Sequence, residues 1–227
     1  MSRVIPLKAD AGARAQTPDS SAPAARRVSR VRARVLAAIN LAAIEVFACE
    51  GLNGASTQAI AERAGLSKQQ LHYYIDSKET LYRQVLQDVI DDWIDVFGFS
   101  DEAHGPRKVL SDYIRRKMVF SFEQPLRSRI FAMEMMRGAP VMRPMLTTAK
   151  RRTAQAVAVI QNWIEQGLMD PIDPLLLLFN TWAITQFYAE HADQVSYYSE
   201  RTTLGRPERE AIIDQNIAFI LRAAGVR

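Results

Sequence analysis

The amino-acid sequence has little of what disulfide-stabilised proteins, metalloproteins and most enzymes need. Cys49 is the only cysteine among 227 residues, so no intrachain disulfide can form and a cytoplasmic location is expected. His72, His104 and His191 are far apart and lack the spacing of metal ligands. No glycine-rich phosphate loop, Gly-x-Ser-x-Gly turn or paired acidic motif is present. These absences argue against an enzyme, and they predict no catalytic residue, no metal and no cofactor.

Long apolar runs and strand-like alternation are also missing. Even the most apolar uninterrupted run, residues 175–179, is far shorter than the roughly 18 residues that a membrane span requires. The start of the chain has no apolar segment of the kind found in secretory signals, so we expect no membrane partner. Nearly every patterned segment repeats its apolar residues with a period of 3.6. The sequence therefore predicts an all-α protein.

Positive charge is concentrated at the front of the chain. Residues 1–34 contain eight Lys or Arg and two Asp, whereas the whole chain carries a net charge of +4, so the remainder is slightly acidic. Residues 1–28 are rich in Ala, Ser, Pro and Arg, which predicts a disordered basic tail. Such a tail either contacts DNA phosphates or is simply solvated, and the sequence leaves both open.

Residues 56–75 predict two short helices joined by a tight turn. Ser56 and Ser67 are suitable N-caps, and Gly65 stands where the first helix must end with a positive φ. The inward positions are Ile60, Ala64, Leu71 and Ile75. A helix, a turn with glycine and a second steep helix form the helix-turn-helix, whose second helix enters the DNA major groove. We predict a DNA-binding domain over residues 29–76, the alternative being a plain helical hairpin.

The second helix of this motif presents donors, amides and aromatic hydroxyls to the outside. The outward residues are Lys68, Gln69, Gln70, His72, Tyr73 and Tyr74. Of these we expect Lys68, Gln69, Gln70 and Tyr73 to face base edges. Ser56, Thr57, Lys78 and Tyr74 are predicted to hold phosphates of double-stranded DNA.

The remaining pattern predicts a helical domain over residues 77–227. A connecting helix, residues 77–97, is predicted to open with Asp76 as cap and Glu79 as its capping-box partner. A polar break at 98–106 precedes five more helices, near 106–121, 126–137, 142–166, 173–192 and 207–224. The short basic runs 115–117 and 150–152 are interpreted as solvated helix faces.

The helix near 173–192 is apolar on more than one face, which indicates burial against a partner subunit. The last helix can supply the other half of a four-helix interface in a homodimer, and a two-fold dimer suits a palindromic operator. Trp182 and Gln186 lie at i, i+4 on one face. An indole beside a carboxamide can hold a small planar ligand, although a glutamine at the interface or on the surface explains Gln186 equally simply.

Two segments resemble the DNA-binding domain of the TetR family of bacterial repressors. They are IAERAGLS at 60–67 and YYIDSKETL at 73–81, with Ile75 and His72 departing from the usual Phe and Tyr. Segments 129–140, 163–167, 170–174 and 182–189 resemble the pyrimidine-utilisation (Rut) regulator subfamily. That resemblance implies a uracil or thymine effector and pocket positions at Trp93, Trp182, Gln186 and, more weakly, Tyr188. It does not extend to Gln69, Gln70 and His72, so the operator is left open.

The sequence as a whole predicts a homodimeric, ligand-responsive transcriptional repressor of pyrimidine catabolism and nitrogen metabolism. One alternative is a repressor of the same type that responds to a lipophilic compound, such as an efflux substrate or an acyl-CoA. The methionines at 133, 135, 136, 142 and 145 suit either a core or such a pocket. A helical enzyme that does not bind DNA is the alternative from another class.

Overall fold

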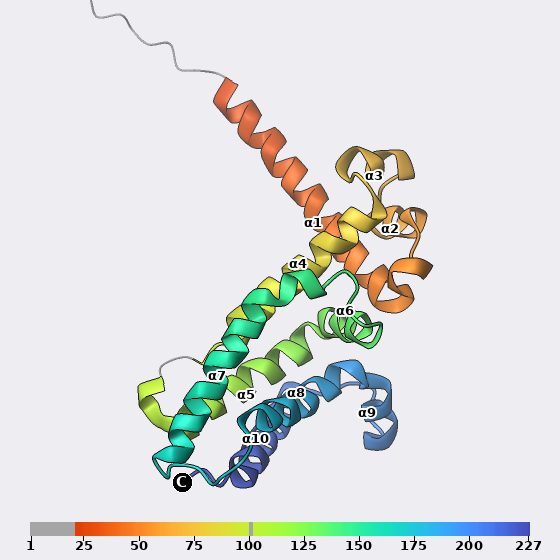
Figure 1. The fold of residues 1–227 in the computed structure, drawn as a ribbon. Coiled ribbons are helices and arrows are strands. Elements are labelled where there is room, and N and C mark those ends of the chain that lie inside the picture. The colour runs from red at the N-terminus through yellow and green to blue at the C-terminus, as the bar shows by residue number, and fades with distance from the viewer. Residues whose placement is uncertain (1–20, 100–101) are drawn as a thin grey trace, which may run out of the picture. The chain divides into compact units, whose positions relative to one another are not determined.

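A computed structural model describes residues 21–99 and 102–227, and it is helical with no strand in these ranges (Figure 1). The all-α prediction is confirmed. The chain divides into two compact units, residues 1–37 and 38–227, and α1 crosses the boundary. The predicted division after residue 76 stays a prediction. Of the predicted tail, residues 1–20 lie outside the described residues, and residues 21–28 belong to α1 rather than to a disordered segment. The helices are α1 (Ser21–Gly54), α2 (Thr57–Arg63), α3 (Lys68–Tyr74), α4 (Lys78–Phe97), α5 (Gly105–Glu123), α6 (Pro125–Met136), α7 (Thr147–Glu165), α8 (Pro174–Glu190), α9 (Ala192–Ser199) and α10 (Arg206–Ala223), with 3₁₀ turns η1 (Glu102–His104) and η2 (Arg143–Leu146).

The second half of α1 is a core helix. Ile39, Ala43 and Phe47 repeat at helical spacing and are each at most 1% exposed. Gly51 ends the regular helix, because its φ of 65° lies in the left-handed region. The stretch Ser29–Gly54 is long and apolar enough to pass as a membrane span by length and composition, although no uninterrupted run of that length exists. From Ile39 onwards its apolar stripe is buried, which identifies this half as part of a packed helical core.

The connecting helix α4 begins one residue later than predicted. Its N-cap is Ser77, whose hydroxyl accepts a hydrogen bond from the Thr80 backbone N–H at 3.0 Å. The predicted cap at Asp76, with Glu79 as its capping-box partner, is therefore wrong, because Ser77 directly precedes the first helical residue and its hydroxyl accepts from the Thr80 N–H. One face of α4 is buried along its whole described length, at Leu81, Tyr82, Val85, Leu86, Val89, Ile90 and Trp93.

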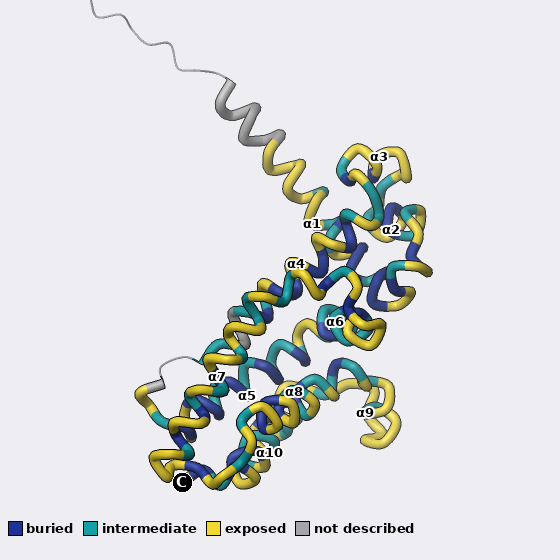
Figure 2. Tube along the Cα trace, viewed as in Figure 1, coloured by how far each residue is buried: buried dark blue, intermediate teal, exposed yellow. Residues whose placement is uncertain are grey.

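The C-terminal core is organised around α5, which packs against α8 and α10 (Figures 1 and 2). Tyr113, Ile114 and Met118 on its inner face are at most 1% exposed. The helix α4 packs against α7 and α6 and runs from α2 and α3 towards this core (Figure 1). The helix α4 therefore connects α2 and α3, which form the predicted DNA reader, with the core around α5.

Two boundaries differ from the sequence prediction. The helix predicted from residue 142 starts with the 3₁₀ turn η2, and α9 occupies a stretch that was predicted partly as loop. The start of α8 is as predicted, since Asp173 Oδ1 accepts from the backbone N–H groups of Leu175 and Leu176 at 2.8 and 3.0 Å. Pro174 stands in the first turn, where its missing N–H causes no loss.

Candidate DNA interface and ligand cavity

The helices α2 and α3 form the tight corner that the sequence predicts. Gly65 has a φ of 70°, and the backbone N–H of Leu66 donates to the Ala61 carbonyl at 2.9 Å. Ala61 and Leu71 are fully buried, so the two helices approach closely through a small residue. Ser56 and Ser67 cap them by accepting from the backbone N–H groups of Ala59 and Gln70. The geometry is that of a helix-turn-helix.

Most of the predicted base-reading side chains lie on the exposed face of α3. Lys68 and Gln69 are exposed, and Tyr73 is 74% exposed; His72, predicted to point outward, is exposed as well. Gln70 differs, because its Oε1 accepts from the Ser67 backbone N–H at 2.8 Å and completes a capping box. In this structure the Gln70 carbonyl oxygen therefore stabilises the start of α3, and only its Nε2 group remains to donate to a base edge.

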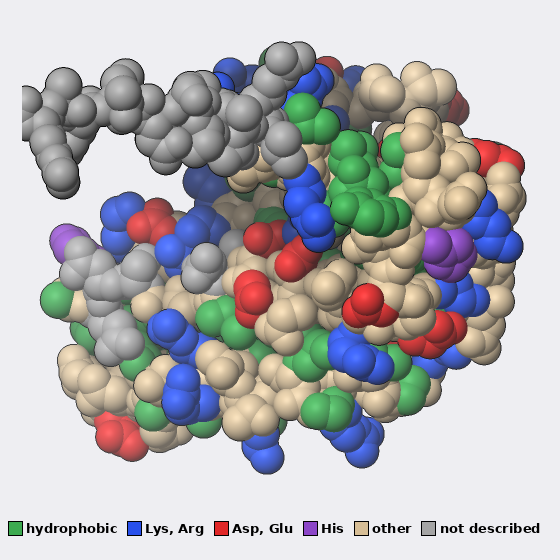
Figure 3. Space-filling view, turned by 90° about the horizontal axis from the view of Figure 1, so that it is seen from above, with side chains coloured by type: hydrophobic (Ala, Val, Ile, Leu, Met, Phe, Trp, Pro, Cys, Tyr) green, Lys and Arg blue, Asp and Glu red, His purple; other side chains and the backbone are tan. Residues whose placement is uncertain are grey.

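The predicted phosphate-holding residues lie around the two ends of the motif. Ser56 is the cap of α2 and Thr57 is its first residue, while Tyr74 packs edge-on against Tyr73 with ring centroids 5.2 Å apart. Lys78 Nζ donates to the Ala55 carbonyl at 2.8 Å. One of the three ammonium protons of Lys78 thus ties the start of α4 to the start of the motif, and two remain for a phosphate. Figure 3, seen from the end where α2 and α3 lie, shows Lys and Arg spread over this face rather than gathered in one cluster.

A cavity of about 520 Å³ lies between α4, α6, α8 and the η2–α7 segment. Three of the four predicted ligand positions, Trp93, Trp182 and Gln186, line it. The other lining residues are Ile90, Phe131, Met135, Arg143, Leu146, Thr147, Ala149, Lys150 and Thr153. The fourth predicted position, Tyr188, is not among them: its ring packs on Phe122 at 5.4 Å and its hydroxyl accepts from Asn216 Nδ2 at 3.4 Å. The lining is mainly apolar with a few polar groups, as in ligand pockets generally.

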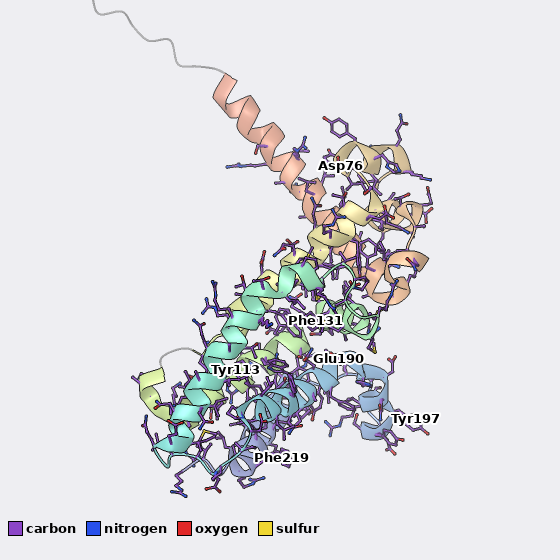
Figure 4. The ribbon with its side chains drawn as sticks, viewed as in Figure 1. Asp76, Tyr113, Phe131, Glu190, Tyr197 and Phe219 are labelled. Carbon is purple, nitrogen blue, oxygen red and sulfur yellow. The ribbon has the colours of Figure 1, made fainter. Side chains whose placement is uncertain are left out.

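Hydrogen bonds hold the two predicted ligand residues of α8 in place. Trp182 Nε1 donates to the Tyr113 hydroxyl at 2.6 Å, and Gln186 Nε2 donates to Glu190 Oε1 at 3.1 Å. Because Glu190 takes only one amide proton of Gln186, the other proton and the carbonyl oxygen remain for a ligand, as a donor beside an acceptor. Tyr113, Phe131 and Glu190 lie around the middle of the helical region in Figure 4.

Behind the cavity lies a buried lysine. Lys117 is 4% exposed, and its Nζ lies 4.6 Å from the centroid of the Trp93 ring. Burial lowers the pKa of Lys117 to about 7, while the negative charge of Glu190 acts in the opposite direction. The prediction that residues 115–117 form a solvated face is wrong for Lys117, because it follows Tyr113 and Ile114 on the inner face of α5 at spacings of four and three.

Two family models together match residues 39–227 of the chain. Residues 39–85 match the family model for bacterial regulatory proteins of the tetR family, and residues 86–227 match the model for the C-terminal region of YcdC-like proteins. The chain belongs to the TetR family of bacterial transcriptional regulators.

Similar TetR-family proteins include a curated regulator and two solved structures. The HTH-type transcriptional regulator RutR of Escherichia coli K12 is 40% identical over 186 residues, which are 82% of this chain and 86% of RutR. A TetR-family regulator from Rhodococcus RHA1 has a TM-score of 0.66 at 16% identity, covering 85% of this chain and 98% of its own. AibR, in a complex with isovaleryl coenzyme A and operator DNA, has a TM-score of 0.61 at 17% identity, covering 82% and 97%. The two structures establish the shared fold.

In this TetR-family protein a buried polar contact joins α4 to α6. The Tyr82 hydroxyl on α4 donates to Glu134 Oε2 at 2.9 Å, and Glu134 Oε1 accepts from the backbone N–H groups of Val141 and Met142 at 2.8 and 3.3 Å. Glu134 is only 1% exposed, so its charge is compensated by these three donors. Burial and the neighbouring Glu134 carboxylate raise the pKa of Tyr82, which keeps its hydroxyl protonated as a donor.

Sequence reasoning missed Glu134, Lys117 and the cationic side chains of the cavity. The signal for Lys117 was available, because its position falls on the apolar face of α5, but no local pattern marks Glu134 as buried. Arg143 and Lys150 become visible only when η2 and α7 are placed beside α4 and α8. Within residues 21–99 and 102–227, no three His, Cys, Asp or Glu side chains lie close enough to hold a metal ion. The prediction that the protein needs no metal or cofactor stays a prediction.

Proposed function

We propose that this regulator is a cytoplasmic, homodimeric repressor that releases its operator when uracil or thymine binds in the cavity. The observation that carries the proposal is the meeting of Trp93, Trp182 and Gln186 in one cavity. Trp93 and Trp182 lie on different helices and are far apart in the sequence, so local spacing alone did not predict that they would line the same cavity. The similarity to RutR supports the same ligand class, because the resemblance to the Rut subfamily implies a pyrimidine effector and control of pyrimidine catabolism.

The chemistry of the lining suits a flat ring with an imide edge. An indole face stacks on a planar ring, and Trp182 is fixed by its bond to Tyr113. The free amide proton of Gln186 can donate to a ring carbonyl while its Oε1 accepts from the adjacent ring N–H. This pairing distinguishes uracil or thymine from a purely apolar molecule, which would leave the carboxamide unmatched.

The switch would act through α4. Ile90 and Trp93 line the cavity near one end of this helix, and Lys78 contacts the reader at the other. A ligand that binds more tightly to the conformation with a displaced α4 increases the population of that conformation. In it, the two α3 helices of the dimer no longer match the spacing of the operator half-sites. Repression would follow from DNA binding without ligand. No part of this proposal needs an enzymatic step.

Dimerisation would use the apolar faces of α8 and α10. Leu176 and Phe179 on α8 are 52% and 50% exposed in the single chain, and Phe219 on α10 is 54% exposed (labelled in Figure 4). Apolar side chains of this size gathered on two adjacent helices mark an interaction surface. A second copy of the chain covers such a surface symmetrically.

A tryptophan-fluorescence titration with uracil and thymine tests the ligand proposal. We expect saturable quenching at micromolar ligand that is lost in Trp182→Phe and in Gln186→Glu, which keeps the size of the side chain but removes its donor. Trp163→Phe is the matched control, because Trp163 stacks on Phe99 and does not line the cavity. A flat response to both pyrimidines with quenching by an acyl-CoA would instead favour the lipophilic effector, for which the mainly apolar lining is the supporting observation.

Retention on operator DNA tests the regulatory proposal. Gln69→Ala should change the preference among operator sequences, because an exposed amide on α3 reads bases. Lys78→Ala should weaken binding to all sequences alike, because we assign Lys78 to a phosphate contact, which carries no sequence information. Equal losses across all sequences in both variants would contradict this assignment of roles.

A further inference from the structure

The cavity is much larger than a free pyrimidine base. An apolar cavity of about 150 Å³ is enough to bind benzene, a ring of similar size to uracil. The cavity in this structure measures about 520 Å³, so a single base would occupy roughly a third of it. Trp182 and Gln186, which suit the base, belong to α8 alone. Space therefore remains beside the η2–α7 side of the lining.

That remaining side is positively charged. Arg143 and Lys150 line the cavity and are exposed, as is Met135 of α6, whereas Trp93 is buried, so the opening lies between the end of α6 and the η2–α7 segment. Neither Arg143 nor Lys150 forms an ion pair with any residue in the described ranges. No Asp or Glu occurs among the lining residues of this cavity. Two cations at the mouth of a cavity without a carboxylate attract a negatively charged group.

We propose that the cavity takes a pyrimidine extended by an anionic group, a phosphate or a carboxylate, which Arg143 and Lys150 bind at the mouth. The inference rests on the proposed function, since it places the ring on Trp182 and Gln186. Arg143 can offer paired N–H donors to two oxygens of the anion, and Lys150 adds a second charge. A free base is then the smallest fragment that the site recognises, and the anion adds affinity at a separate part of the cavity.

Two pairs of probes isolate the contribution of the anion. Uridine and uridine 5′-monophosphate differ by a phosphate, and uracil and orotate differ by a ring carboxylate. The affinity of each is measured by calorimetry on the full-length protein and on Arg143→Gln/Lys150→Gln. The control Lys108→Gln/Arg151→Gln removes the same charge from two exposed residues outside the lining. An exposed ion pair contributes about three-fold in affinity, so two together give about ten-fold.

We expect at least one anionic probe to bind about ten-fold more tightly than its neutral partner. This advantage should fall below about three-fold in the Arg143→Gln/Lys150→Gln variant and when salt rises from about 50 to about 300 mM, because these charges are solvent-accessible. It should persist in the control variant, whose affinity for uracil should equal that of the wild type, because both of its substitutions lie outside the lining.

The inference is overturned if neither anionic probe exceeds its neutral partner, or if the control variant loses the advantage to the same extent. The uracil arm reports separately on the proposed function. Uracil binding without an anion advantage removes only the present inference, whereas no binding of any pyrimidine removes both.

Discussion

Replacing the buried Lys117 by methionine should make the protein more stable, by an amount that depends on pH. Lys117 is 4% exposed and belongs to the inner face of α5. Methionine has a similar length and no charge, so it can fill the same space. The variant tests whether the buried charge of Lys117 lowers the free energy of unfolding.

The size of the effect follows from the pKa of Lys117. Desolvation lowers this pKa from 10.5 to about 7 although the charge of Glu190 raises it. One pKa unit corresponds to about 1.4 kcal/mol, so the charged lysine destabilises the folded state by about 5 kcal/mol at most. Between the two pKa values the unfolded chain binds more protons than the folded chain, so stability rises with pH. Below pH 7 both states are protonated, and the destabilisation is present in full.

Urea unfolding followed by circular dichroism measures this dependence at one fixed protein concentration. From about pH 6.5 to about pH 8.5 the wild type should gain about 2 kcal/mol relative to Lys117→Met, whose advantage shrinks accordingly. The matched control is Lys108→Met on the same helix, because Lys108 is exposed and bonded to Asp112. It should follow the wild type across this range. Parallel pH profiles for the wild type and Lys117→Met would refute the reasoning, since a solvated lysine produces no such difference.

Three further changes test the corner, the buried contact and the dimer. Gly65→Ala should lower the free energy of unfolding by about 1 kcal/mol, because a residue with a Cβ is strained at a φ of 70° even though no atom lies within 4 Å of that Cβ. Thermal unfolding measures the effect, and an unchanged midpoint would contradict it. Tyr82→Phe should cost about 1–3 kcal/mol in urea unfolding by removing one of the three donors to buried Glu134, and a neutral effect would mean that the contact does not stabilise the fold. Leu176→Lys should give monomers in light scattering while Gln155→Lys, exposed on α7, should not; a Leu176→Lys dimer would remove α8 from the interface.

The parts of the fold that local chemistry determines were predictable from the sequence. Ser56, Ser67 and Asp173 cap their helices because each has a short acceptor followed by orphan backbone donors. Gly65 ends α2 for an equally local reason, the positive φ that the turn needs. The period of 3.6 likewise indicated the buried face of α4. Where two local acceptors competed, as with Asp76 and Ser77, the sequence pattern did not decide between them.

The parts that depend on distant partners were not predictable in this way. Glu134 is buried because Tyr82, Val141 and Met142 supply its donors, and nothing within α6 itself marks that position. The cavity likewise depends on the packing of four segments. Trp182 and Gln186 could be paired by their spacing, but Trp93 was assigned through the family resemblance alone. Tyr188, assigned in the same way, contacts Phe122 and Asn216 instead of the cavity.

Different residues of α4 serve the predicted DNA contact and the cavity, and this separation has an evolutionary consequence. Lys78, at one end of this helix, belongs to the predicted DNA contacts, whereas Ile90 and Trp93 line the cavity. The other candidate DNA contacts lie in residues 56–74, and the other cavity residues lie beyond residue 130. Substitutions can therefore accumulate in α3 without disturbing the effector site, so that related regulators can keep one metabolite signal while acquiring new target promoters. By the same logic, a chimaera joined within α4 should exchange operators between two such proteins and preserve the inducer of the C-terminal parent.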